Sequence, residues 1–413
     1  MQHNILKKSD KEIYRALLGE ERRQKEGLEM IASENYVSVA VLEALGTVFT
    51  NKYSEGYPGR RYYGGQEFTD AVETLAIARA KKLFGAEHAN VQPLSGASAN
   101  LAAYAAILKP GDTVLGMDLS HGGHLTHGHP VTLSAQIYRF VRYKTEPDGS
   151  LDYKKLETLA KKEKPRLILA GFSAYTRQLD YAKFSAIAKK AQAYSMMDMA
   201  HIAGLVAGKA LPNPIPYFDI VTTTTHKTLR GPRGGVIFCK QELAQAIDKS
   251  VFPGLQGGPH MHNIAAKAVA FGEALKPAFK KYAEQTLKNA KALEKELAKH
   301  SYKIVFGGTD NHMILVDVFA TLQISGKEAE RALDTVGITV NKNMIPDDTR
   351  SPLDPSGIRI GVPAITTRGM REKEVRQLAR VIDKTLRQRD DQKTLKQLRE
   401  EVKKLCKKFP IYH

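Results

Sequence analysis

Tryptophan is absent from this chain of 413 residues, and only two cysteines, Cys239 and Cys406, are present. Two isolated cysteines cannot build a disulfide framework, and neither has a companion cysteine at the spacing of a metal site. Residues 1–27 contain no apolar core long enough for a signal peptide, and no stretch approaches the roughly 18 apolar residues of a membrane span. These absences predict a cytoplasmic protein that does not associate with a membrane.

Acidic residues are the scarcer charged class, with 44 Asp and Glu against 62 Lys and Arg, which gives a formal net charge of +18. Such an excess suggests nucleic acid as a binding partner. However, the basic residues are spread along the chain, and their densest excess, at 371–410, has acidic residues interleaved at helical spacings. This pattern is typical of a solvated helix face. A nucleic-acid function, which needs basic residues gathered on one face, is therefore the disfavoured alternative.

Helical patterns alternate with short apolar runs from about residue 70 to residue 275. Helices are predicted at 69–85, ending at Gly85, and at 98–111, ending at a Pro-Gly pair. The predicted strands lie at 113–118, 166–171, 194–199, 219–225 and 234–239. Most of these strands are near-continuous apolar runs, which predicts βαβ units and a mainly parallel sheet buried on both faces.

The pattern changes near residue 280. Residues 274–300 predict a long helix that Pro277 breaks, and mixed strands and helices follow it. The first part of the chain is helical and then loop-like. The sequence therefore predicts an arm with a dimer and active-site loop (1–65), a large cofactor-binding α/β domain (66–279) and a small α+β domain (280–413).

Candidate chemistry gathers where the strands are predicted to end, because ligands of open α/β sheets bind at the carboxyl ends of strands. Asp198 ends one strand with His201 close behind it, and Lys227 follows a β-branched strand. Ser95 and Gly96 open a helix in a small-residue turn that suits an anion. An amine, a carboxylate and an anion seat match pyridoxal phosphate, whose aldehyde, ring nitrogen and phosphate need these three partners.

Several segments resemble the signature segments of the serine hydroxymethyltransferase family, in the family's order between residues 31 and 369: IASEN, NKYSEGYPGRRYYGG, HGGHLTHG, DMAHIAGL, THKTLRGPRGG, FPGLQGGPHMH and SGIRIG. The resemblance implies a type I pyridoxal-phosphate (aspartate-aminotransferase-like) fold. It also implies a homodimer or a dimer of dimers with sites shared between subunits. The implied reaction is the reversible transfer of the serine hydroxymethyl carbon to tetrahydrofolate, which gives glycine and 5,10-methylenetetrahydrofolate.

The resemblance also implies roles around the cofactor. Lys227 is the expected Schiff-base lysine, Asp198 pairs with the pyridine N–H, and His124 stacks on the pyridine ring. The other expected cofactor-binding residues are Ser95, Gly96, Ala97, Ser173, His201 and His226, together with Tyr53, Gly257 and Gly258 for contacts across subunits. The catalytic set implied in this way is Lys227, Glu55, Tyr63, His124 and Thr224.

Further roles concern the substrate and the folate. Arg359 is expected to clamp the amino-acid carboxylate with the bidentate fork that a lysine lacks, and Ser33 adds a hydrogen bond. Glu55 handles protons at the substrate hydroxyl and the folate, and Tyr63 lies close to the reacting carbons. The positions where the family holds the pterin are Leu119, Gly123, Leu125 and Asn343.

A run of histidines, His121, His124, His127 and His129, looks like a set of metal ligands. No Cys, Asp or Glu stands within the run to complete a site. No metal is therefore expected, and the histidines other than His124 are assigned structural roles.

The chain departs from the residues that are common in the family at a few positions, namely Leu94, Ser98, His129, Thr176 and Val362. None of these changes removes a group that the chemistry needs, but Leu94, Ser98 and Val362 are expected to reshape the pocket. They leave one alternative open, a folate-independent aldolase that acts on threonine-like β-hydroxy amino acids. The intact Glu55 and the pterin-facing segment argue against this alternative.

Overall fold

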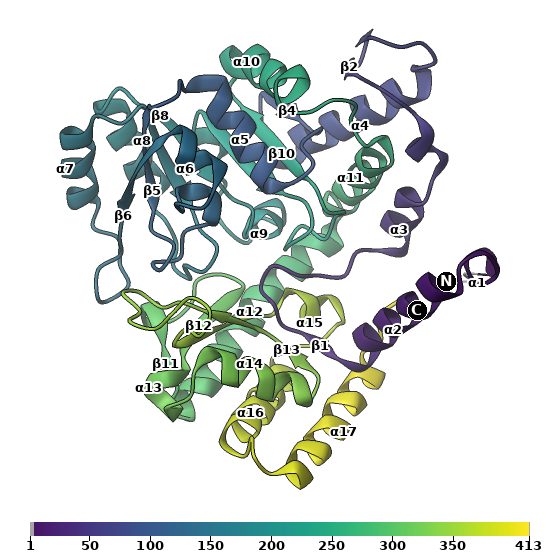
Figure 1. Ribbon diagram of the computed structural model, residues 1–413, viewed down its shortest axis with the longest axis vertical. Helices are drawn as coiled ribbons and strands as arrows, with labels where there is room; N and C mark the ends of the chain where they lie inside the picture. The colour runs from purple at the N-terminus through teal and green to yellow at the C-terminus, as the bar shows by residue number, and fades with distance from the viewer. Residues whose placement is uncertain (1–3, 413) are drawn as a thin grey trace.

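A seven-stranded sheet forms the centre of the larger of two lobes in the computed structural model, which describes residues 4–412 (Figure 1). Its strands run in the order β4-β10-β9-β8-β7-β5-β6. Neighbours are parallel except for β10, which is antiparallel to both β4 and β9. The strands are β4 (His88–Asn90), β5 (Thr113–Met117), β6 (Arg139–Tyr143), β7 (Leu167–Gly171), β8 (Tyr194–Asp198), β9 (Ile220–Thr224) and β10 (Gly235–Cys239). The prediction of a mainly parallel sheet is confirmed.

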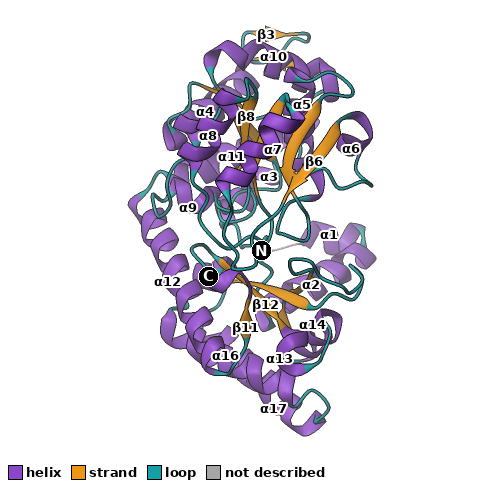
Figure 2. Ribbon diagram, turned by 90° about the vertical axis from the view of Figure 1, so that its left-hand side faces the viewer, coloured by secondary structure: helices purple, strands orange, loops and turns teal. Residues whose placement is uncertain are grey.

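Burial on both faces explains the apolar and β-branched character of these strands. Every residue of β7, β9 and β10 is buried. Each predicted strand is present and begins and ends within one residue of its predicted bounds. Helices cover both faces of the sheet (Figure 2): α4 (Glu67–Phe84), α5 (Gly96–Ile107), α6 (Leu133–Ile137), α7 (Tyr153–Glu163), α8 (Tyr181–Lys190), α9 (Ala203–Ala207), α10 (Ala244–Lys249) and α11 (Met261–Ala274).

Single residues determine where two helices of this lobe end or begin. Gly85 stops α4 by adopting a left-handed conformation with φ of 69°, which costs a glycine little. Ser95 starts α5, since its hydroxyl accepts a hydrogen bond from the Ser98 amide at 3.1 Å. The helix ends at Ile107, a few residues before the predicted stop.

The smaller lobe is built on an antiparallel sheet of four strands in the order β11-β12-β15-β14. These are β11 (Lys303–Ile304), β12 (Met313–Asp317), β14 (Asn341–Asn343) and β15 (Gly357–Gly361). The helices of this lobe are α13 (Val318–Leu322), α14 (Gly326–Thr335), α15 (Pro363–Thr367), α16 (Glu372–Arg387) and α17 (Gln392–Lys408). Pro277 breaks the long helix as predicted, because it opens α12 (Pro277–Lys299), which runs along both lobes (Figure 2).

The N-terminal segment contributes to both lobes. It contains α1 (Asn4–Ser9), α2 (Lys11–Glu26), β1 (Leu28–Glu29), α3 (Val39–Leu45), β2 (Gly56–Tyr57) and β3 (Arg60–Arg61). Strand β1 pairs in parallel with β13 (Ile338–Thr339), and Leu28 and Met30 enter the core of the smaller lobe. Helix α3 packs on α11 of the larger lobe. Within 4–412, no helix combines the length and the apolar character needed to cross a bilayer.

Candidate active site

A cavity of about 430 Å³ opens at the carboxyl ends of β5, β7, β8 and β9, where the two lobes meet. Its wall includes segments far apart in the sequence, from the loop after β1 to strand β15. The sequence-predicted site residues that line it are Ser33, Ser95, Gly96, Ala97, His124, Ser173, Asp198, His201, Thr224, His226, Lys227 and Arg359. Tertiary folding therefore brings most of the predicted site into one place.

Asp198 ends β8 in the floor of the cavity, and three groups hold its carboxylate. Oδ2 accepts hydrogen bonds from Nδ2 of Asn100 at 2.9 Å and from Nε2 of His127 at 3.2 Å, while Oδ1 accepts from the Ala200 amide at 3.0 Å. Burial by itself raises the pKa of Asp198, but the His127 hydrogen bond and nearby positive charge outweigh it and hold the pKa well below its ordinary value. The site therefore keeps a buried carboxylate ionised.

His127 has a defined tautomer in this arrangement. Its Nδ1 accepts a hydrogen bond from the His124 amide at 3.2 Å, so its Nε2 carries the proton that it donates to Asp198. His127 is therefore a support for the carboxylate.

Lys227 follows β9, and its side chain is buried against the same cavity. Within 4–412, no hydrogen bond engages its ammonium group, so the amine is left for a ligand. Burial lowers the pKa of Lys227 to about 8, with a further contribution from Arg359 and Arg233, while the charge of Asp198 opposes the shift. A lysine of lowered pKa supplies a usable fraction of neutral amine near neutral pH, which nucleophilic attack on a carbonyl requires.

The start of α5 lies at the cavity, where the sequence predicts an anion-binding site. Ser95 caps this helix, and Gly96 and Ala97 form its first turn beside Thr224 of β9. A Cβ on Gly96 would lie 2.7 Å from Cγ2 of Thr224, so a side chain there would push the helix start away from β9. Free backbone N–H groups and the positive end of the helix dipole favour a phosphate at this turn.

Arg359 lies in the middle of β15 and reaches the cavity from the smaller lobe. Its Nη1 donates to the Ser173 carbonyl at 2.6 Å, and its Nε donates to Oδ1 of Asn341 at 3.1 Å. Burial lowers the pKa of Arg359 to about 10, which still leaves the guanidinium charged near neutral pH. The two bonds orient the guanidinium, and its charge faces the cavity that holds Lys227.

The histidines of the cavity are neutral near neutral pH. Burial lowers the pKa of His124 to about 4. Burial and the charge of Lys227 lower the pKa of His226 to about 3 and hold that of His201 well below its ordinary value. The His201 ring stacks on His312, with ring centroids 5.5 Å apart. Neutral imidazoles of this kind can pack on a flat ring without adding charge.

The sequence argument against a metal site considered only residues within the histidine run. No acid stands inside the histidine run, but folding brings Asp198 to His124 and His127, and one possible ligand atom from each lies within 4.8 Å of the others. In this structure the Asp198 carboxylate is already engaged by Asn100 and His127. Adjacency in the sequence was therefore the wrong criterion for this cluster.

A second cluster contains five of the predicted residues that do not line the cavity. Tyr53 and Tyr63 lie edge to face with ring centroids 5.3 Å apart, and both rings are about half exposed. Positions Gly257 and Gly258 lie against Glu55 and the Tyr53 ring. None of these five residues lines the cavity of Lys227 within the same chain.

Arg61 fixes the loop that carries Glu55. Its Nη1 donates to the carbonyls of Ser54 and Gly56, at 2.8 and 2.9 Å, and these two residues flank Glu55. Its Nη2 pairs with the buried Glu73 at 2.6 Å. Arg61 therefore holds the loop of Glu55 in place through contacts within the larger lobe.

The predicted folate-facing positions also lie outside the lining of this cavity: Leu119, Gly123, Leu125 and Asn343. Leu125 is 46% exposed, and Asn343 lies in β14 next to β15. Leu94, Ser98 and Val362 do not line the cavity either, and the expectation that they reshape the pocket stays a prediction. Ser98 instead accepts a hydrogen bond from the Ser95 amide at 2.9 Å and so completes the cap of α5.

Sequence reasoning missed several residues of the site. Glu34, Phe172 and Ala200 line the cavity, and each lies next to a predicted position, so proximity in the chain could have indicated them. Arg233, which lies in the quoted segment THKTLRGPRGG, also lines the cavity. Nothing in the sequence indicated that Asn100 belongs to the site. It lies one turn into α5, and only the packing of α5 against β9 and β10 brings its amide to Asp198.

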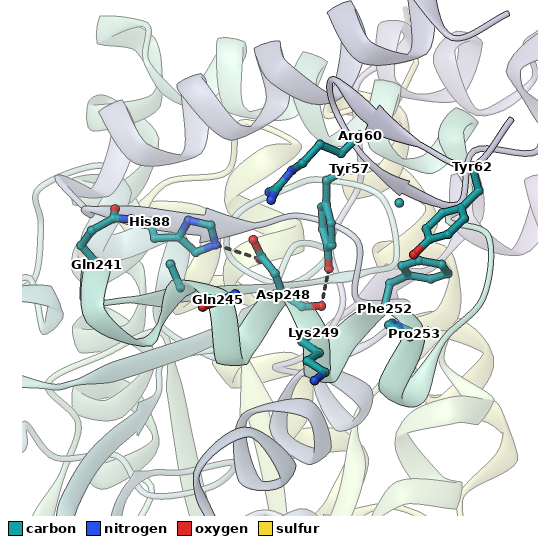
Figure 3. A pocket seen from close by; sticks show the side chains of 12 residues that line it. Tyr57, Arg60, Tyr62, His88, Gln241, Gln245, Asp248, Lys249, Phe252 and Pro253 are labelled. Atoms are coloured by element: carbon teal, nitrogen blue, oxygen red, sulfur yellow. Dashed lines mark hydrogen bonds and ion pairs between the residues drawn. The ribbon is translucent and has the colours of Figure 1, made fainter. Parts of the chain in front are cut away.

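A larger cavity, of about 580 Å³, lies elsewhere on the larger lobe (Figure 3). Its polar groups bond to one another: Nε2 of His88 lies 2.9 Å from Oδ1 of Asp248, and the Tyr57 hydroxyl donates to the Asp248 carbonyl at 2.6 Å. Its cations, Arg60 and Lys249, are exposed. The smaller cavity, with its buried lysine, arginine and aspartate, is therefore the one equipped for chemistry.

The fold and the site together define a class of protein. A mostly parallel sheet that presents a buried lysine, an ionised aspartate and a capped helix start at the carboxyl ends of its strands is that of a pyridoxal-phosphate-dependent enzyme of fold type I.

Comparison with known proteins identifies the family. The family model described as serine hydroxymethyltransferase matches residues 6–382. A protein of Acidobacterium capsulatum with the name serine hydroxymethyltransferase is 59% identical over 408 residues, which cover 98% of this chain and 95% of that protein. A protein of Koribacter versatilis with the same name is 58% identical over 408 residues, which cover 98% and 96%. The chain belongs to the serine hydroxymethyltransferase family, whose enzymes use pyridoxal phosphate and take tetrahydrofolate as co-substrate.

Proposed function

We propose that this chain catalyses the reversible transfer of the hydroxymethyl carbon of serine to tetrahydrofolate, which gives glycine and 5,10-methylenetetrahydrofolate. The observation that carries the proposal is the meeting of Lys227, Asp198 and Arg359 in one cavity. The three side chains supply an amine for the cofactor, an ionised carboxylate for its ring nitrogen and a cation for the amino-acid carboxylate. No finding favours the folate-independent aldolase.

Pyridoxal phosphate, when bound, supplies an electron sink for bonds broken at the α-carbon of an amino acid. Lys227 would supply the amine for its aldehyde, and the ionised carboxylate of Asp198 would stabilise a proton on its ring nitrogen, because the pKa of Asp198 is low. The turn at Ser95, Gly96 and Ala97 holds the phosphate. His124 would pack on the ring, His201 and Ser173 would contact its phenolic oxygen, and Thr224 and His226 line the wall next to the lysine.

The amino-acid substrate is oriented by its carboxylate. Arg359 approaches from the smaller lobe and forms a charge-assisted contact with it, and Ser33 adds a hydrogen bond from the loop after β1. Holding the carboxylate in this way would orient the α-carbon toward the cofactor. The bond to be broken is thereby aligned by the chain's own residues.

In this proposal the protein works as a homodimer or as a tetramer built from two dimers. The cluster of Tyr53, Glu55, Tyr63, Gly257 and Gly258 serves the cavity of a second subunit. Two observations support this: the cluster lies outside the cavity of its own chain, and the rings of Tyr53 and Tyr63 are about half exposed. Glu55 then holds or releases the proton at the serine hydroxyl and at the folate, with Tyr63 beside the reacting carbons.

Tetrahydrofolate binds at the mouth of the site in this proposal, against Leu119, Gly123, Leu125 and Asn343. The exposure of Leu125 and the location of Asn343 next to β15, which carries Arg359, support a ligand that enters from the surface.

The domain organisation that we propose keeps the divisions predicted from the sequence. These are an arm with the dimer loop (1–65), a large cofactor-binding domain (66–279) and a small C-terminal domain (280–413). A cytoplasmic location is also part of the proposal, and it is supported by the two free, buried cysteines, Cys239 and Cys406.

One experiment tests the function directly. Purified protein loaded with pyridoxal phosphate is given serine, and glycine formation is measured with and without tetrahydrofolate. The proposal expects serine cleavage that depends on tetrahydrofolate. Cleavage that proceeds equally without it would replace the transferase by an aldolase.

A further inference from the structure

A lysine that the proposed reaction does not use is buried beneath the anion-binding turn. Lys267 lies on α11 and is 1% exposed. A buried ammonium group must be paired or fully hydrogen-bonded to be tolerated. Its surroundings therefore show what holds it there.

Three backbone carbonyls accept the three protons of this ammonium group. Nζ of Lys267 donates to the carbonyl oxygens of Val91 at 2.6 Å, Pro93 at 3.0 Å and Gly235 at 2.9 Å. Val91 and Pro93 follow β4 and lead directly into the turn at Ser95, whereas Gly235 begins β10. Lys267 therefore joins two backbone segments that no single element of secondary structure connects.

These segments touch the turn and the cofactor lysine. The Gly235 amide donates to the Pro93 carbonyl at 2.9 Å, and a Cβ on Gly235 would overlap the Ser95 carbonyl oxygen. The neighbouring Gly234 donates its amide proton to Nδ1 of His226 at 3.4 Å, one residue before Lys227. A shift of either segment would therefore move the start of α5 relative to β9.

Charge alone does not explain the burial of Lys267. Burial lowers its pKa to about 7, and the charge of Glu73 opposes this shift. Glu73 itself is engaged by Arg61 at 2.6 Å and by Nε2 of Gln92 at 2.8 Å. Only the protonated amine has three N–H donors, and it can therefore donate to all three carbonyl groups at once.

We propose that Lys267 is a positioning residue that sets the anion-binding turn at Ser95 and Gly96 at the distance from Lys227 that the phosphate of the cofactor requires. This inference rests on the proposed function, because it takes pyridoxal phosphate as the ligand. Lys267 acts through the backbone and does not touch the cofactor. Its effect is therefore specific to the phosphate end of the ligand.

Binding of pyridoxal phosphate is compared with binding of pyridoxal, which has the same ring and aldehyde but no phosphate. Full-length protein freed of cofactor is titrated with each ligand, for the wild type and for Lys267→Met. The variant keeps the length of the side chain but has no donor. We expect its affinity for pyridoxal phosphate to fall by about tenfold or more, because charge-assisted hydrogen bonds that hold the turn are lost. Its affinity for pyridoxal stays close to that of the wild type.

The matched control is Phe271→Leu, a change in a fully buried side chain one turn further along α11. It lowers the melting temperature without affecting the preference for the phosphate ligand. If Lys267→Met does not fold, Gly234→Ala decides the question, because a Cβ there would lie 2.9 Å from Nζ of Lys267 and displace the ammonium group. The same selective loss is expected for this variant.

The possible outcomes distinguish the positioning role of Lys267 from the proposed function of the protein. A selective loss of affinity for pyridoxal phosphate supports the positioning role. Equal losses for both ligands, or no loss for either, overturn it, since Lys267 would then be a general stabilising residue or irrelevant to the site. A wild-type protein that fails to bind pyridoxal phosphate at all would instead overturn the proposed function.

Discussion

The imidazole of His127 and the carboxylate of Asp198 lie 3.2 Å apart in the buried floor of the cavity. This hydrogen bond is the leading influence that opposes the effect of burial on the Asp198 carboxylate. The ionised state of Asp198 therefore depends on a residue from the histidine run, 71 positions earlier in the chain.

We predict that His127→Leu raises the pKa of Asp198. A carboxyl whose pKa is depressed in the folded state stabilises that state above its unfolded pKa, and the stabilisation is lost as the pH falls through the folded value. Without His127 the loss begins at a higher pH, so cofactor binding fails earlier on acidification. Titration of cofactor affinity against pH measures the shift. His129→Asn changes a histidine of the same run that does not line the cavity. In this variant, cofactor affinity should be lost at the same acidic pH as in the wild type.

Lys227→Ala should abolish covalent attachment of the cofactor. Borohydride reduction of the wild type should fix the cofactor to the peptide that contains residue 227, and mass spectrometry locates the label. Lys249→Ala, a change at an exposed lysine of the larger cavity, should be labelled like the wild type. A label on any other peptide of the wild type would show that the lysine is wrongly assigned.

Arg359→Lys should raise the serine concentration for half-saturation far more than it weakens cofactor binding. A lysine keeps the charge but loses the bidentate fork, and the loss of such a contact amounts to about 1.5–3 kcal/mol, or roughly one to two decades in affinity. Steady-state kinetics with serine, together with a cofactor titration, measure both effects. An unchanged dependence on serine would mean that the substrate carboxylate is held elsewhere.

Glu55→Gln should remove nearly all folate-dependent cleavage of serine, by a factor of roughly 10² or more if the carboxyl acts as a general acid–base. Release of aldehyde from allo-threonine should survive much better, because Lys227, Asp198 and Arg359 are untouched. The two activities are measured side by side on one preparation. Equal losses would make Glu55 a structural residue of its loop.

Mixing two inactive variants tests whether sites are shared between subunits. If Glu55 serves the cavity of the partner, a dimer of one Lys227→Ala subunit and one Glu55→Gln subunit has one site with both native residues. Refolding the two variants together in equal amounts should then restore about a quarter of the wild-type activity, since half of the dimers carry one intact site out of two. The variants refolded separately are the control. No recovery on mixing would assign Glu55 to the cavity of its own chain.

The strands and the residues at their ends were predictable from the sequence because both are local properties. Strands β7 and β9 are short apolar or β-branched runs buried on both faces, and such runs form strands in most tertiary contexts. The carboxyl ends of parallel strands meet at one edge of a sheet, so Asp198 and Lys227 were expected to lie close together. The roles of Arg359, Ser33 and Glu55 came from the family resemblance.

Only the tertiary structure decided which distant groups support those residues. Asn100 and His127 reach Asp198 because α5 and the loop after β5 pack against the end of β8, and no periodicity in the sequence encodes that contact. The separation of Glu55 from the cavity of Lys227 likewise depends on where Arg61 anchors its loop. Lys267 would be expected on the surface from its residue type, and it is buried because three carbonyls from two separate segments meet its ammonium group. Hydrogen bonds between segments far apart in the chain are set by packing, and packing is a property of the whole fold.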